Sequence, residues 1–153
     1  MKILVCTDGS KHSQKALEKT LELTEGCKSV SDLAVIYVYD GRHDSTLPSL
    51  AGAESFTFEQ VQNYKTMLDV HKKEKKKILA SAVKFFKEKN VKARSIFLEG
   101  HPAHMIVRTA KEQNFDLIVI ASEGLSGIER LLIGSVSNAV IQEAKDCSVL
   151  LVK

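Results

Sequence analysis

Two short stretches of the sequence are almost entirely apolar, and they restrict the possible fold more than any other feature. Residues 33–39 are rich in β-branched and aromatic side chains, and residues 117–120 are apolar throughout. A strand without a polar face suits a parallel sheet that is covered on both sides. We therefore expect an α/β fold in which helices enclose a central sheet.

Strand-like and helical segments alternate along the whole chain. The strands are expected at residues 2–7, 33–39, 91–98, 116–120 and 148–152. Apolar residues at helical spacing predict helices that begin after Ser10, at Thr57, at Pro102 and near Ser135. Because helical crossovers join the strands, we expect parallel pairing with right-handed connections. The predicted architecture is a doubly wound, three-layer sandwich.

Short polar signals mark several of the expected helix ends. Ser10 is a suitable N-cap, and Gly26 is a suitable stop for the same helix. Thr57 and Gln60 have the spacing of a capping box. Asn90 can end the long second helix in a left-handed conformation.

The size and charge of the chain limit the number of domains and the kinds of partner that we expect. The 153 residues suffice for one domain, 1–153, with a substantial core. The net charge of +3 comes from mixed basic and acidic residues, so we expect neither a nucleic-acid nor a membrane partner. No apolar run approaches the roughly 20 residues that span a bilayer. We take Met1 as the start of the first strand and expect a cytoplasmic protein.

Three cysteines, Cys6, Cys27 and Cys147, form no CxxC pair. An odd number without that spacing predicts neither a disulfide framework nor a zinc site. Cys6 and Cys147 lie in or beside strand-like runs, which favours buried small apolar side chains.

Residues 121–137 carry the chemistry of an anion site. Gly124 permits a tight turn, and Gly134 and Ser135 stand where the last helix is expected to begin. The first N–H groups of a helix lack internal partners and carry partial positive charge, so phosphate binds well there. The hydroxyls of Ser135 and Ser137 add donors. Glycine and serine at a helix start are also ordinary capping residues, so both interpretations stay open.

The same segment resembles the motif of the universal stress protein family, G-x2-G-x9-G-[ST]. Gly124, nine further residues, Gly134 and Ser135 match its second and third parts. Residues 2–10, 37–40, 100–102, 116–120 and 148–153 resemble other segments of the family, so the likeness covers the whole chain. It implies a five-stranded parallel sheet of order 3-2-1-4-5 with four helices.

The resemblance also implies a ligand, ATP with or without Mg²⁺, and a homodimer formed through the last strand. In ATP-binding members, the residue matching Asp8 faces the ribose or phosphates, and the backbone of the residue matching Val38 contacts adenine. The residues implied to hold the nucleotide are Cys6, Thr7, Asp8, Val38, Ile120, Ala121, Glu123, Gly124, Gly134, Ser135, Val136 and Ser137. The chain is thus expected to be an ATP-binding stress-response module.

Two residues depart from the family pattern. Ala121 replaces the first glycine of the motif, and Glu123 can bring negative charge near the phosphates. These departures support an alternative, a dimeric interaction protein of the same fold that binds no ATP.

No set of residues indicates catalysis, since the pattern Gly-x4-Gly-Lys-[ST] is absent. We therefore expect no enzyme and no metal site. Slow ATP hydrolysis or self-phosphorylation at Ser135 or Ser137 stays an alternative. His101 and His104 lie three apart near the expected site, where they can serve as ligands or belong to the surface.

Two further segments have open interpretations. Residues 41–56 form the longest stretch without an apolar periodicity. Such a stretch can be a functional loop or an ordinary surface loop. Residues 72–77 include five lysines, which favours the solvated face of a long helix over an anion-binding patch.

Overall fold

A five-stranded parallel sheet in the order β3-β2-β1-β4-β5 forms the centre of the protein, as the sequence predicts. The computed structural model describes residues 1–26, 29–41, 57–123 and 133–153. The strands are β1 (Lys2–Cys6), β2 (Asp32–Tyr39), β3 (Arg94–Glu99), β4 (Leu117–Ala121) and β5 (Ser148–Val152). The helices are α1 (Lys11–Gly26), α2 (Phe58–Glu88), α3 (Pro102–Glu112) and α4 (Ser135–Glu143).

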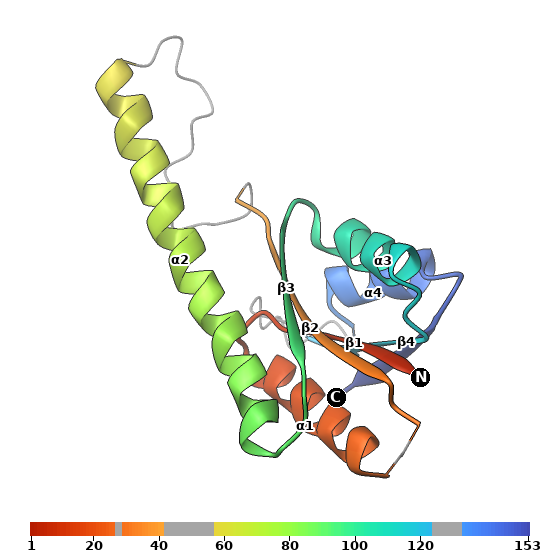
Figure 1. The fold of residues 1–153 in the computed structure, drawn as a ribbon. Coiled ribbons are helices and arrows are strands. Elements are labelled where there is room, and N and C mark those ends of the chain that lie inside the picture. Colours follow the sequence, from red (N-terminus) through yellow and green to blue (C-terminus); the bar gives the residue numbers. More distant parts are fainter. Residues whose placement is uncertain (27–28, 42–56, 124–132) are drawn as a thin grey trace.

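Each face of the sheet has its own apolar core. Helices α1 and α2 cover one face, and α3 and α4 cover the other (Figure 1). Ile3 and Val5 of β1 pack toward α1 and α2, whereas Leu4 packs toward α3 and α4. This alternation explains the absence of a polar face in the central strands, and it confirms the three-layer architecture.

Strand order reverses at β1, and this reversal fixes where a ligand can enter. The chain leaves β1 for β2 on one side, while β4 pairs with β1 on the other side. The segments that follow β1 and β4 therefore run to opposite faces of the sheet. They leave a crevice at the carboxyl ends of the strands, where doubly wound folds bind ligands.

The predicted N-caps of α1 and α2 are present. The Ser13 amide donates to Ser10 Oγ at 3.0 Å. At α2, the Gln60 amide donates to Thr57 Oγ1 at 3.2 Å, and the Thr57 amide donates to Gln60 Oε1 at 2.9 Å. The capping box is thus confirmed, and it satisfies amides that would otherwise lack partners. Gly26 is the last residue of α1, as expected of a stop.

The expected start of the third strand at residue 91 was wrong by three residues, because the turn before it is longer. Asn90 has φ of 58° and ends α2 in the predicted left-handed conformation. Its amide donates to Lys87 O at 3.0 Å, and the Val91 amide donates to Phe86 O at 2.9 Å. These two bonds form a Schellman motif. Residues 91–93 complete the reversal, so β3 begins only at Arg94.

The lysine-rich part of α2 lies beside β3. Lys72 Nζ lies 2.8 Å from Glu99 Oε2, and Lys76 Nζ lies 5.2 Å from the centre of the Phe97 ring. Lys73 and Lys77 are exposed, as the solvated-face interpretation expects. Among the helices of the described residues, none combines the length and apolarity needed to cross a membrane.

Gly9 fixes the turn from β1 to α1 and should tolerate no side chain. Its φ is +81°, and an added Cβ would lie 2.9 Å from Ile78 Cγ2 of α2. We predict that Gly9→Ala lowers the free energy of unfolding by about 1–3 kcal/mol, from backbone strain and this collision. Urea denaturation measures the change.

Gly26→Ala is the matched control, because nothing lies within 4 Å of an added Cβ there. It should be neutral or raise the stability slightly, since alanine favours helix. Equal losses of stability in the two variants would contradict the proposed role of Gly9.

Candidate functional site

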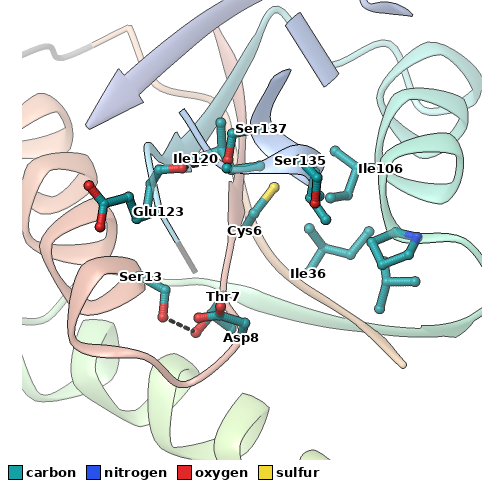
Figure 2. Close-up of a pocket in the computed structure, with 15 residues that line it drawn as sticks. Cys6, Thr7, Asp8, Ser13, Ile36, Ile106, Ile120, Glu123, Ser135 and Ser137 are labelled. Atoms are coloured by element: carbon teal, nitrogen blue, oxygen red, sulfur yellow. Dashed lines mark hydrogen bonds between the residues drawn. The ribbon is translucent and has the colours of Figure 1, made fainter. Parts of the chain in front are cut away.

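A cavity of about 360 Å³ opens at the carboxyl edge of the sheet, where the strand order reverses. This volume lies within the usual range of small-molecule sites. It is bounded by the ends of β1, β2 and β4 and by the starts of α3 and α4 (Figure 2). The lining residues are Cys6, Thr7, Asp8, Ser13, Ile36, Val38, Pro102, Ile106, Ile120, Ala121, Glu123, Gly134, Ser135, Val136 and Ser137.

The structure brings together every predicted site residue that it describes. They come from three strands and one helix that are far apart in the sequence. Gly124 lies outside the described residues. His101 and His104 are exposed and are not part of the lining.

The end of β1 contributes an ordered polar corner. The Thr7 amide donates to Ile36 O at 3.0 Å, which continues the pairing of β1 with β2 beyond Cys6. Thr7 Oγ1 lies 3.2 Å from Ser13 Oγ, and this bond is drawn in Figure 2. Asp8 Oδ1 accepts from the Ser10 amide at 2.9 Å. These bonds hold Thr7 and Asp8 at the cavity before any ligand arrives.

The start of α4 forms the opposite wall and presents amides to the cavity. Gly134 is the N-cap, with φ of −66° and ψ of 156°, and as a glycine it has no side chain to cap the helix. The Gly134 amide itself donates to Ser122 O at 2.6 Å. In the first turn, Ser135, Val136 and Ser137 carry the amides that have no partner four residues earlier. An anion can take the place of the missing cap.

Ala121 occupies the position of the motif's first glycine without backbone strain. It is the last residue of β4 and is 5% exposed. Among the described non-glycine residues, positive φ occurs only at Asn90 and Asn114. Ser137 Oγ donates to Ala121 O at 2.7 Å, so this strand end and α4 are joined. The methyl group is compatible with the local fold.

Apolar side chains line the remainder of the cavity. Val38 and Ile120 were predicted, whereas Ile36, Ile106 and Pro102 were missed, as was Ser13 of α1. Two of these had a signal in the sequence. Ile36 shares the face of Val38 because strand side chains alternate, and Ile106 follows Pro102 by about one helical turn. The apolar surface suits an aromatic ring.

Glu123 lines the cavity two residues after β4 ends. Its side chain extends toward α1 (Figure 2), and Glu123 Oε2 lies 3.8 Å from His12 Nε2. The two side chains are 30% and 36% exposed, respectively. The charge of Glu123 near the site was expected from the sequence, whereas its partner on α1 was not.

The Cys6 thiol lies on the cavity side of β1 and is 7% exposed. Burial raises its pKa far above the ordinary range, and the neighbouring charge of Asp8 raises it further. The reactive form of cysteine is the thiolate, so Cys6 is an unreactive, apolar part of the site. The expectation of a buried small side chain is confirmed for Cys6, whereas Cys147 is only partly buried.

This protonation state predicts slow alkylation of Cys6. With iodoacetamide at pH 8, native Cys6 should react more than about tenfold slower than the same residue in the urea-unfolded chain. Peptide mass spectrometry measures the extent of labelling over time. Labelling of Cys6 at the same rate in both states would contradict the interpretation.

Comparison with known proteins supports the resemblance. A model described as the Universal stress protein family matches residues 1–153. Universal stress protein YxiE of Bacillus subtilis is 36% identical over 156 residues, which cover 99% of this chain and 98% of that protein. Universal stress protein UspA from Lactobacillus plantarum has the same fold, with a TM-score of 0.78 and 23% identity over 100% of this chain and 97% of that one.

Two similar solved structures are nucleotide complexes. A universal stress protein in complex with cAMP has a TM-score of 0.66 and 24% identity, covering 100% of this chain and 97% of that one. The universal stress protein from Archaeoglobus fulgidus in complex with dAMP has a TM-score of 0.63 and 22% identity, covering 100% and 98%.

Proposed function

The chain belongs to the universal stress protein family, and on that premise we propose that its cavity binds an adenine nucleotide. The observation that carries the proposal is the first turn of α4 in the wall of the cavity, where the N-cap is a glycine without a side chain. Its amides supply the donors and partial positive charge that a phosphate requires. The cAMP and dAMP complexes of relatives agree with this class of ligand.

Each part of the nucleotide has a suitable place. The apolar side chains of Ile36, Val38 and Ile106 would enclose the adenine ring. The Asp8 carboxylate would accept bonds from the ribose hydroxyls, while Ser135 and the first turn of α4 would hold phosphate. ATP, with or without Mg²⁺, is the proposed physiological ligand.

We assign the chain a binding role in a cytoplasmic stress response, in which nucleotide occupancy changes the contacts it makes with partners. We propose no catalytic role. Burial keeps the Cys6 thiol protonated, so it is unsuited to covalent chemistry at neutral pH.

Gly134→Val should abolish nucleotide binding without unfolding the protein. The backbone of Gly134 is extended, so a β-branched residue fits it, while the side chain would fill the space in front of the α4 amides. We predict a loss of more than about tenfold in ATP affinity. Isothermal titration calorimetry with ATP and Mg²⁺ measures it, and circular dichroism checks the fold.

Gly26→Val is the matched control, because Gly26 has open space around it and lies at the far end of α1. It should bind ATP as the wild type does. The proposal fails if wild-type protein gives no signal at millimolar ATP and carries no nucleotide after purification.

A nucleotide-free interaction protein is the second candidate, because Glu123 brings a carboxylate into the cavity. Thermal denaturation separates the two functions. A ligand present at 100 times its Kd stabilises the folded state by about 2.7 kcal/mol, so binding raises the melting temperature. A folded dimer whose melting temperature does not change when ATP and Mg²⁺ are added would favour this second function.

We also propose a homodimer that pairs the β5 edges of two copies. Strand β5 ends the sheet, and Val149, Leu150, Leu151 and Val152 are only partly buried. An open apolar edge of this kind favours pairing with another strand. Sedimentation equilibrium should give twice the 16.9 kDa of one chain.

Val149→Lys should shift that equilibrium toward monomer, because symmetric pairing brings like charges to one interface. Ile141→Lys is the control, since Ile141 is 40% exposed on α4 and lies off the edge. A wild-type chain that sediments as a monomer would refute the proposed dimer.

A further inference from the structure

Two carboxylates line the cavity that would receive the phosphates. Asp8 stands at the end of β1, and Glu123 follows the neighbouring strand β4. They are the only charged side chains among the described residues of the lining. A negative charge inside a cavity proposed for an anion requires an explanation.

Glu123 follows a residue whose backbone is bonded to the start of α4, while its own side chain extends toward α1 (Figure 2). The carbonyl of its neighbour Ser122 accepts the Gly134 amide at 2.6 Å. This bond joins the segment that carries Glu123 to the N-cap of α4. The carboxylate and the first turn of α4 therefore line the same cavity, where they have opposite effects on a bound anion.

The Glu123 carboxylate is also held in place and partly shielded from water. His12 Nε2 lies 3.8 Å from Glu123 Oε2, which keeps the side chain on the α1 side of the cavity (Figure 2). Only 30% of the Glu123 side chain is exposed. Partial burial lowers the effective dielectric, so repulsion of an anion is stronger there than in open solvent.

We infer that Glu123 is a specificity-determining residue, which makes affinity fall as the negative charge of the nucleotide rises. The α4 amides can satisfy one phosphate, which carries about two negative charges at most. Each additional phosphate adds negative charge that the Glu123 carboxylate repels. An adenine monophosphate therefore binds more tightly than uncomplexed ATP, which still binds, and Mg²⁺ lessens the difference by neutralising charge. The inference rests on the proposed nucleotide site.

Calorimetric titration of AMP and of ATP, each in EDTA and in MgCl₂, tests this selectivity. The wild type should bind AMP more tightly than ATP in EDTA. Glu123→Gln, which keeps the shape of the side chain and removes its charge, should raise ATP affinity about tenfold and AMP affinity much less. Added salt should reduce the wild-type preference, because it screens the carboxylate.

Glu143→Gln is the matched control, because it makes the same charge change at an exposed position at the far end of α4. It should leave both affinities unchanged. Equal AMP and ATP affinities in wild-type protein, or an equal change for both ligands in Glu123→Gln, would overturn the inference alone. Failure of both nucleotides to bind the wild type and Glu123→Gln would overturn the proposed site itself.

Discussion

The burial of β1 between two strands and two helical layers is the constraint on which the rest of the structure depends. Ile3, Leu4 and Val5 are 0% exposed, and β1 pairs with β2 on one side and β4 on the other. Its backbone groups are satisfied within the sheet, and its side chains can only be apolar. Polar chemistry is therefore confined to the strand ends. Thr7 and Asp8 directly follow the carboxyl end of β1 and are the first polar residues after its apolar run.

Hydrogen bonds between the strand ends and α4 convert the crevice into a shaped site. Gly134 N to Ser122 O and Ser137 Oγ to Ala121 O both join the end of β4 to the first turn of α4. They fix the direction of the helix, and its N-cap, Gly134, has no side chain to bond the leading amides. The other face of the crevice is set by Thr7 and Ser13, whose hydroxyls bond each other. Preorganisation of this kind lowers the cost of ordering a ligand site.

The fold could be predicted from the sequence because its signals are local and repeated. Apolar runs locate the strands, and the capping residues Ser10 and Thr57 locate helix starts. The start of β3 could not be predicted, because it depends on the number of residues in the turn after Asn90. Within the site, the residues at strand ends were found, whereas Ser13 was missed. Its side chain reaches the cavity through the packing of α1 on the sheet, and packing of helices has no short sequence signature.

The contact between His12 and Glu123 also could not be predicted from the sequence, because it depends on how α1 packs on the sheet. The two departures from the family motif, Ala121 and Glu123, have different consequences. Ala121 fits a strand end with ordinary φ, so its methyl group alters the backbone little. Glu123 instead alters the charge within the cavity, where partial burial keeps that charge effective. A site with unaltered backbone geometry and an added carboxylate keeps the amides that attract phosphate and gains a group that repels it. The second departure from the family motif therefore concerns the charge within the cavity, and neither departure alters the shape of the fold.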